Sequence, residues 1–401
     1  MSRSIGARLA RVFVSTCIVA LTVPVFLVGC DGETGYGDGE TVRIGAVLSL
    51  SGSLAGLGEP ARRAIEVEVD RINADGGVNG RMVEVLYEDD ASDEARSVAA
   101  ASRLIDQEGV VAIIGGSGTG QSMAMRQEIE PGAVPQVALA GGSIVTDQFS
   151  PWVFQTPWPN RVVVPFTLEN LQAAGIERLA IIAESGGYGK DGSDVTKDFV
   201  DEFGIEIVAE EQFNRGDTDM TPQLTKVRAE APDAVLMWAA GAEAATILKN
   251  NAAIGGAAPL RFFGAPGNAR LEFVEGAGDA AEGFMFAAGH ILVPETYGVD
   301  TEAYEVATSF IDRYTERWGA GPDIFAGHAY DAIHIIVEAA RRSPADFTPG
   351  DLRDEIEATS GLVSVGGTFT FSPTDHNGMT ADDLTMYVIE NGAWAPVEEV
   401  R

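Results

Sequence analysis

The chain has 401 residues, of which 60 are acidic and 27 basic, and a formal net charge of −33. That charge argues against nucleic acid and anionic lipid headgroups as direct partners, since both would be repelled. The hydrophobic fraction of 45% is typical of a globular protein. Because a chain of this length exceeds one ordinary hydrophobic core, the sequence predicts two lobes.

Residues 1–29 have the layout of a secretory signal peptide. The positive start contains Arg3, Arg8 and Arg11. An apolar run over residues 12–28 follows, and it ends in the sequence LVGC at Cys30. This ending resembles a bacterial lipobox, in which the cysteine is lipidated and becomes the first residue of the mature protein. The alternative is a single transmembrane anchor, for which a run of about 17 residues is at the short limit.

The polar segment that follows the signal peptide predicts a tether. Asp31–Thr41 is glycine-rich and acidic and has no apolar period, so residues 30–41 are expected to be flexible. Lipid chains on Cys30 would hold the folded part at a membrane surface while leaving it free to turn. This lipid anchor is the only membrane contact that the sequence predicts.

The folded part is more acidic than the whole chain. Residues 1–29 contain three basic and no acidic residues, so the rest has 24 basic against 60 acidic residues and a net charge of −36. The acids are spread along the chain, which favours adaptation to high salt, because salt screens the repulsion between them. The alternative is an acidic but otherwise ordinary secreted protein.

Residues 42–116 alternate apolar strands with amphipathic helices. They read as strand VRIGAVLSL, helix EPARRAIEVEVDRINADGG, strand MVEVLYEDD, helix DEARSVAAASRLIDQEG and strand VVAIIGG. Such alternation predicts parallel pairing, with helices on both faces of the sheet. Ligands of these sheets bind beyond the carboxyl ends of the strands, which here are Ser49–Ser53, Asp89–Asp90 and Gly115–Gly120.

The same alternation recurs in residues 177–267, which predicts a second lobe and a cleft between the two. Three further helices are expected over Glu302–Trp318, Phe325–Arg342 and Pro349–Thr359. The chain is expected to cross between the lobes near Phe154–Pro159, within 283–298 and within Gly367–Gly378. The predicted limits are 42–156 with 288–370 for lobe 1 and 157–287 with 371–401 for lobe 2. Three crossings would form a hinge that closes the lobes on a ligand.

Several segments together resemble the periplasmic substrate-binding proteins of branched-chain amino acid ABC transporters, the Leu/Ile/Val-binding type. They include IGAVLSLSG, DRINADGGVNGR, AIIGG, ESGGYGKDG, FNRGDTDMTPQLTKVRAEAPDAVL and AYDAIHIIVEAA. The resemblance runs over nearly all of residues 42–397. It implies the type I fold, which is α/β with two doubly wound parallel-sheet lobes joined by a three-crossing hinge. It also implies a monomer without a cofactor, outside the cytoplasmic membrane, that binds a small molecule and delivers it to an ABC permease.

The strand end at Gly115–Gly120 offers backbone N–H groups and a helix N-terminus, which suit a carboxylate. The resemblance places a ligand-binding hydroxyl in this loop at Thr119, beside Gly118. It places a backbone carbonyl and a second hydroxyl at Gly141 and Ser143. The alternative is a tight turn whose hydroxyls only cap the helix.

On the second lobe, the resemblance places an aromatic ligand contact at Tyr188. Trp238 and Gly241, at the next strand end, are candidates for the facing wall. The alternative for Trp238 is packing in the core of a buried strand. Ser53 and Asn268 complete the predicted ligand-binding set.

One position departs from the amino-acid-binding members of the resembled family. Those members have an acid for the ligand ammonium after the strand that here reads RFFGAPGN, and Pro266 occupies its place. Leu57 also stands where such members often have tyrosine. A buried ammonium without a counter-charge is costly. The sequence therefore favours an amide or a small organic acid over an amino acid, and a desamino analogue is expected to bind at least as well.

The sequence predicts a binding protein and no enzyme. Its four histidines lack metal-ligand spacing such as HExxH, and no GxSxG frames a serine. They are His290, His328, His334 and His376. The acidic cluster around Asp89–Asp90 does not have the spacing of a calcium loop and reads as a solvated strand end. The alternative function is a ligand-sensing protein for a signalling partner, and a secreted hydrolase would need a nucleophile or metal that the sequence does not show.

Overall fold

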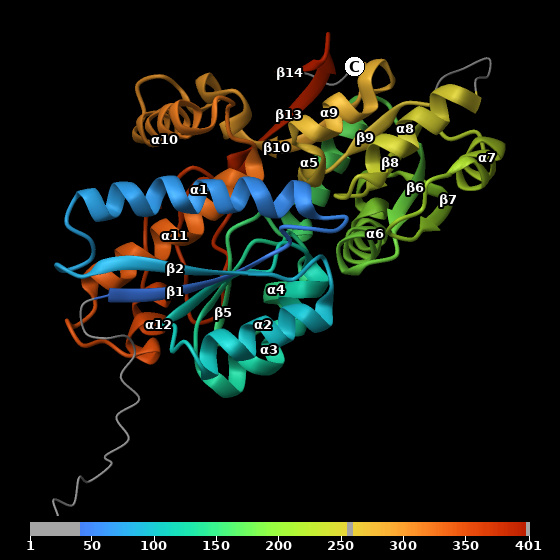
Figure 1. Ribbon diagram of the computed structural model, residues 1–401. Coiled ribbons are helices and arrows are strands. Elements are labelled where there is room, and N and C mark those ends of the chain that lie inside the picture. Colours follow the sequence, from blue (N-terminus) through green and yellow to red (C-terminus); the bar gives the residue numbers. More distant parts are fainter. Residues whose placement is uncertain (1–40, 255–259, 398–401) are drawn as a thin grey trace, which may run out of the picture. The chain divides into compact units, whose positions relative to one another are not determined.

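The structure, a computed structural model, describes residues 41–254 and 260–397 (Figure 1). The predicted signal peptide, Cys30 and all of the tether except Thr41 lie outside these residues. Within the described part, no helix is both long and apolar enough to cross a membrane.

The first part of the chain forms a five-stranded parallel sheet in the order β2-β1-β3-β4-β5. Its strands are β1 (Thr41–Leu48), β2 (Met82–Asp89), β3 (Ala112–Gly115), β4 (Gln136–Ala138) and β5 (Val153–Gln155). The helices between them are α1 (Ala55–Ala74), α2 (Glu94–Asp106) and α3 (Thr119–Gly132), and the four-residue α4 (Ile144–Asp147) follows β4. The central strands are buried almost throughout because helices cover both faces, as apolar strands of this kind predict.

A seven-stranded sheet has the order β14-β13-β10-β9-β8-β6-β7. Its strands are β6 (Arg178–Glu184), β7 (Glu206–Phe213), β8 (Ala234–Trp238), β9 (Phe262–Gly264), β10 (Met285–Gly289), β13 (Leu384–Glu390) and β14 (Ala393–Pro396). Its helices are α5 (Asn160–Ala173), α6 (Gly187–Phe199), α7 (Thr221–Ala229), α8 (Glu243–Ile254) and α9 (Leu271–Ala277). Pairing is parallel from β7 to β10, whereas β13 and β14 are antiparallel. The turn Asn391-Gly392, with both φ angles positive, gives the tight hairpin between them.

The last three long helices belong with the five-stranded sheet. They are α10 (Glu302–Trp318), α11 (Ile324–Arg342) and α12 (Pro349–Glu357). The α11 helix packs along α1, and α10 also contacts α1, as Figure 1 shows for the blue and orange helices. The side chain of Asp323 caps α11 by accepting the N–H groups of Phe325 and Ala326 at 3.0 Å. Nearly every side chain of α11 is buried, so this helix fixes the back of the cleft.

The chain passes between the two sheets between β5 and α5, between β10 and α10, and between β12 (Thr368–Phe369) and β13. A short two-stranded sheet of β11 (Leu362–Val363) and β12 precedes the last passage. The two sheets and their helices confirm the α/β fold class. The predicted lobe limits and the closing motion of the hinge stay predictions.

The net charge leads to a prediction about stability. We expect the melting temperature to rise between dilute buffer and molar sodium chloride, because screening relieves the repulsion among the excess acids. Differential scanning calorimetry in sodium chloride measures this directly. Sulfate is avoided because it stabilises proteins in general by exclusion from their surface. A melting temperature that is flat or falls with added salt would contradict salt adaptation.

Candidate functional site

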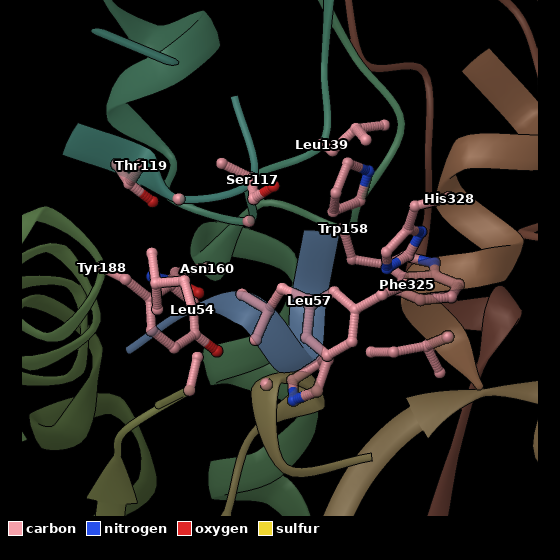
Figure 2. Close-up of a pocket in the computed structure, with 18 of the residues that line it drawn as sticks. Leu54, Leu57, Ser117, Thr119, Leu139, Trp158, Asn160, Tyr188, Phe325 and His328 are labelled. Carbon is pink, nitrogen blue, oxygen red and sulfur yellow. The ribbon is translucent and has the colours of Figure 1, made fainter. Parts of the chain in front are cut away.

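A pocket lies at the carboxyl ends of strands from both sheets (Figure 2). It is lined by the starts of α1, α3, α6 and α11, by the ends of β4 and β6, and by the segments after β5, β8 and β9. Its lining of apolar side chains with a few polar groups is typical of a small-molecule site. The parallel strands predict this location, because their carboxyl ends meet at one edge of each sheet.

The loop between β3 and α3 forms one polar wall. Gly118 precedes the helix and has no side chain to cap it, so the first N–H groups of α3 are not used by a side-chain cap. The hydroxyl of Thr119 accepts the N–H of Gly142 at 3.2 Å, and that of Ser117 accepts the N–H of Ser49 at 3.0 Å. Each hydroxyl keeps its own hydrogen for a ligand oxygen. This wall therefore suits a carboxylate or another acyl oxygen.

The two predicted residues that follow β4 differ in their placement. Gly141 lines the cavity, and its carbonyl accepts the N–H of Asn160 at 3.0 Å. Ser143 lies outside the lining, because its hydroxyl accepts the N–H of Arg161 at 2.7 Å. Ser143 thus holds the start of α5 in place and does not itself line the cavity.

Tyr188 lines the opposite wall, at the start of α6. Burial raises the pKa of its hydroxyl, so the hydroxyl is neutral and free to donate at physiological pH. Trp238 is buried behind it, with ring centroids 5.7 Å apart in an edge-to-face arrangement, and its Nε1 donates to Thr196 Oγ1 at 3.1 Å. Of the two alternatives for Trp238, the structure favours core packing.

Three other predicted residues lie near the cavity but not in its lining. The amide of Asn268 donates to the carbonyl of Ala239 at 2.9 Å and accepts the N–H of Ala265 at 3.2 Å, so it braces the ends of β8 and β9. Gly241 and Ser53 face each other, since a Cβ on Gly241 would stand 3.7 Å from the Ser53 carbonyl oxygen. Pro266 and Gly267 line the cavity instead.

An acid that the sequence analysis did not identify also lines the cavity. Glu184, the last residue of β6, is 1% exposed. One of its oxygens accepts from Arg215 Nη2 at 3.0 Å, and the other has no hydrogen-bond partner among the described residues. The cavity lining thus contains a carboxylate that comes from β6 and not from the segment after β9, and Arg215 pairs with it. The only sequence signal is its position at the end of an apolar strand.

The chain matches the model of the periplasmic binding protein family over residues 41–393. It belongs to this family. The Leu/Ile/Val-binding protein homolog 7 of Brucella suis biovar 1 is 26% identical, over 96% of this chain and 98% of that protein. Homolog 8 of Brucella abortus is 27% identical, over 92% of each chain.

Solved structures confirm the type I fold of this periplasmic binding protein. The branched-chain amino acid transporter substrate-binding protein LivJ of Streptococcus pneumoniae, in complex with isoleucine, has a TM-score of 0.78 and 26% identity. The match covers 89% of this chain and 99% of LivJ. An extracellular ligand-binding receptor of Rhodopseudomonas palustris HaA2, 24% identical over 89% of this chain and 99% of its own, has a TM-score of 0.82 and shows the fold alone. Members of the family are substrate-binding receptors outside the cytoplasm that work with ABC permeases.

In this binding protein, one side chain of α6 connects the two halves of the cleft. Asp191 accepts the N–H groups of Ser143 at 2.8 Å and Ile144 at 3.1 Å, and the side-chain amide of Asn160 at 2.8 Å. Ser143 and Ile144 follow the five-stranded sheet, whereas α6 packs on the seven-stranded one. Burial raises the pKa of Asp191, and its hydrogen-bond donors oppose that shift. We call Asp191 with these three donors the cleft latch.

The acidic strand end of β2 positions the first wall of the cavity. Asp90 is fully buried and accepts from Ser49 Oγ at 2.6 Å and Ser97 Oγ at 3.1 Å. Asp89 accepts the N–H of Leu50 at 2.9 Å. The two aspartates hold the turn before α1, which carries Leu54 and Leu57 into the cavity lining. The interpretation of these acids as wholly solvated is therefore wrong for Asp90.

Proposed function

We propose that this protein is an extracytoplasmic receptor that encloses a small molecule between its two lobes and delivers it to an ABC permease. The observation that carries the proposal is one cavity with polar walls from both sheets. Hydroxyl groups and a helix N-terminus line one wall, and a buried carboxylate lines the other. Family membership and the relatives named for leucine, isoleucine and valine support the same role.

The ligand that fits these walls best has both an acyl oxygen and an N–H donor. Thr119, Ser117 and the first turn of α3 would bind the carboxylate or carbonyl. The unpaired oxygen of Glu184 requires a donor, because a buried acceptor left without one is destabilising. An α-amino acid satisfies both walls, and an amide satisfies them in part. Leu54 and Leu57 supply the apolar surface for its side chain.

Calorimetric titration with leucine and its desamino analogue 4-methylpentanoate tests the proposal. Leucine is expected to bind more tightly, because only leucine has an ammonium for Glu184. Thr119→Val should weaken leucine binding about tenfold, the value of a hydrogen bond to a charged group. Thr225→Val is the matched control, since Thr225 is exposed on α7 and bonds only its own helix. Tight binding of the acid with no response to leucine would contradict the ligand class.

We propose further that the protein is anchored by lipid on Cys30, after cleavage of residues 1–29. The sequence LVGC after a charged start and an apolar run supports this. Cys30→Ala should leave the precursor uncleaved or release unlipidated protein, as gel mobility and membrane fractionation would show. Cys17→Ala is the control, because it leaves the lipobox intact. A Cys30→Ala protein that is processed and bound to membranes like the parent would contradict the anchor.

A further inference from the structure

The cavity has a second end, away from the polar walls. Figure 2 shows Trp158, Phe325 and His328 together on one side and Thr119 and Tyr188 on the other, with leucine side chains between them. Trp158 belongs to the segment between β5 and α5, and Phe325 and His328 lie in the first turns of α11. This end is therefore built where the chain first passes between the sheets, and the side chains of α11 close it.

Two polar atoms at this end have no hydrogen-bond partner among the described residues. They are Trp158 Nε1 and His328 Nδ1, on side chains that are 2% and 3% exposed. The two rings lie edge to face with centroids 5.3 Å apart. Buried polar groups are nearly always paired in proteins, and an unpaired one is costly. Two unpaired groups side by side in the lining of a ligand cavity indicate that the ligand supplies the partner.

Both groups are uncharged. Burial alone lowers the pKa of His328 to about 3, so its imidazole is neutral at physiological pH. The indole of Trp158 can only donate, whereas a neutral imidazole nitrogen donates or accepts according to its tautomer. A hydroxyl oxygen accepts from Trp158 and also pairs with either form of His328. A carboxylate or ammonium would find no counter-charge in these two rings.

We propose that Trp158 and His328 form a distal subsite for a hydroxyl group at the far end of the ligand's apolar body. The subsite rests on the proposed function, because it lies in the same cavity as the head-group walls. It narrows the ligand class to small molecules with a head for Thr119 and Glu184, an apolar middle and a terminal hydroxyl. Leucine, isoleucine and valine fill the middle and leave the subsite unpaired.

Matched ligand pairs that differ by one hydroxyl test the subsite in calorimetric titrations of the full chain. The pairs are tyrosine with phenylalanine, 6-hydroxynorleucine with norleucine, and 3-(4-hydroxyphenyl)propanoate with 3-phenylpropanoate. The first two have amino-acid heads of different length, and the third has an acid head. In at least one pair the hydroxyl member should bind about tenfold or more tightly, since a site built for a hydroxyl rejects the analogue that lacks it.

Two variants locate the effect. Trp158→Phe and His328→Phe each keep an aromatic ring but remove a polar atom, so the preference for the hydroxyl member should fall to near unity in each. Either variant suffices if the other does not fold. Trp394→Phe is the matched control, because Trp394 lies on β14 and its Nε1 is already paired with the carbonyl of Leu292 at 3.1 Å. The control should keep the preference of the parent.

The outcomes separate the subsite from the function on which it rests. Equal binding of both members of every pair overturns the subsite and leaves the receptor intact. A preference that survives in both Trp158→Phe and His328→Phe also overturns it. No binding by any of the six ligands, nor by leucine or 4-methylpentanoate, overturns the proposed function and the subsite with it.

Discussion

Glu184→Ala should weaken the binding of an α-amino acid by about 30-fold or more. Glu184 is buried in the cavity lining with one oxygen on Arg215 and the other unpaired, so it is the group that would face the ligand ammonium. Truncating one partner of a buried charge pair typically costs about 2–5 kcal/mol, and each 1.4 kcal/mol is roughly a factor of ten in affinity. Calorimetric titration of parent and variant with the same amino acid measures the loss.

Two comparisons isolate the charge of Glu184 from its effect on the fold. Glu206→Ala should leave affinity unchanged, because Glu206 is exposed on β7 and pairs only with Arg178 at 3.5 Å. The desamino analogue should lose far less affinity than the amino acid in Glu184→Ala, since it has no ammonium. An equal loss for both ligands would show that Glu184 acts by holding Arg215 and the cavity wall, and would contradict its role as counter-charge.

Asp191→Ala should weaken every ligand of this cavity about tenfold, whatever its head group. The cleft latch joins α6 to the segment after β4 through three hydrogen bonds to one carboxylate, and such bonds are worth roughly 1.5–3 kcal/mol each when the acceptor is charged. Loss of the latch disfavours the arrangement in which both walls meet the ligand. The apparent affinity then falls in proportion to the fraction of molecules in that arrangement.

The latch prediction has a control on the same helix. Asp194 is partly exposed on α6 and pairs with Lys190 and Lys197, so Asp194→Ala removes a charge without touching the latch. It should leave affinity unchanged. Small-angle scattering should show a larger radius of gyration for ligand-free Asp191→Ala than for the parent or the control. Unchanged affinity and unchanged scattering in Asp191→Ala would contradict the latch.

The regular elements follow from local patterns, and the sequence therefore predicts them well. The helix expected over Glu302–Trp318 has the same limits in the structure, and the one expected over Phe325–Arg342 begins one residue earlier. Apolar residues at a spacing near 3.6 define such helices without reference to the rest of the chain. The sequence does not distinguish the short strand β5 (Val153–Gln155) from the crossing predicted near Phe154–Pro159, because three residues are too few to show a period.

The site is predicted only where its residues come from strand ends. Gly118, Thr119, Gly141 and Tyr188 follow recognisable strand ends, and the structure places all four in the cavity lining. Their role in ligand binding stays a prediction. The side chains of Ser143, Trp238 and Asn268 are bonded to protein partners instead, an arrangement that depends on rotamers and on neighbours distant in sequence. Ser53 and Gly241 lie near the cavity but outside its lining.

Two of the missed residues, Trp158 and His328, do not lie at strand ends. Trp158 lies in a crossing, and His328 comes from a helix far along the chain that docks on α1. A lone histidine on a helix, such as His328, gives no indication of the cavity that it will line. The acid is expected after β9, whereas Glu184 ends β6, and only the sheet order β9-β8-β6 brings the ends of these strands to the same wall.

Because the chain passes between the two sheets three times, each sheet needs segments from late in the sequence before it can finish folding. The five-stranded sheet is covered by α11, which packs on α1 from the other end of the sequence, and the seven-stranded sheet gains β13 beside β10 only near residue 390. Contacts so distant in sequence form slowly, because a long loop must close before they are made. Neither half can therefore reach its final structure while the chain is still being synthesised up to its last strands.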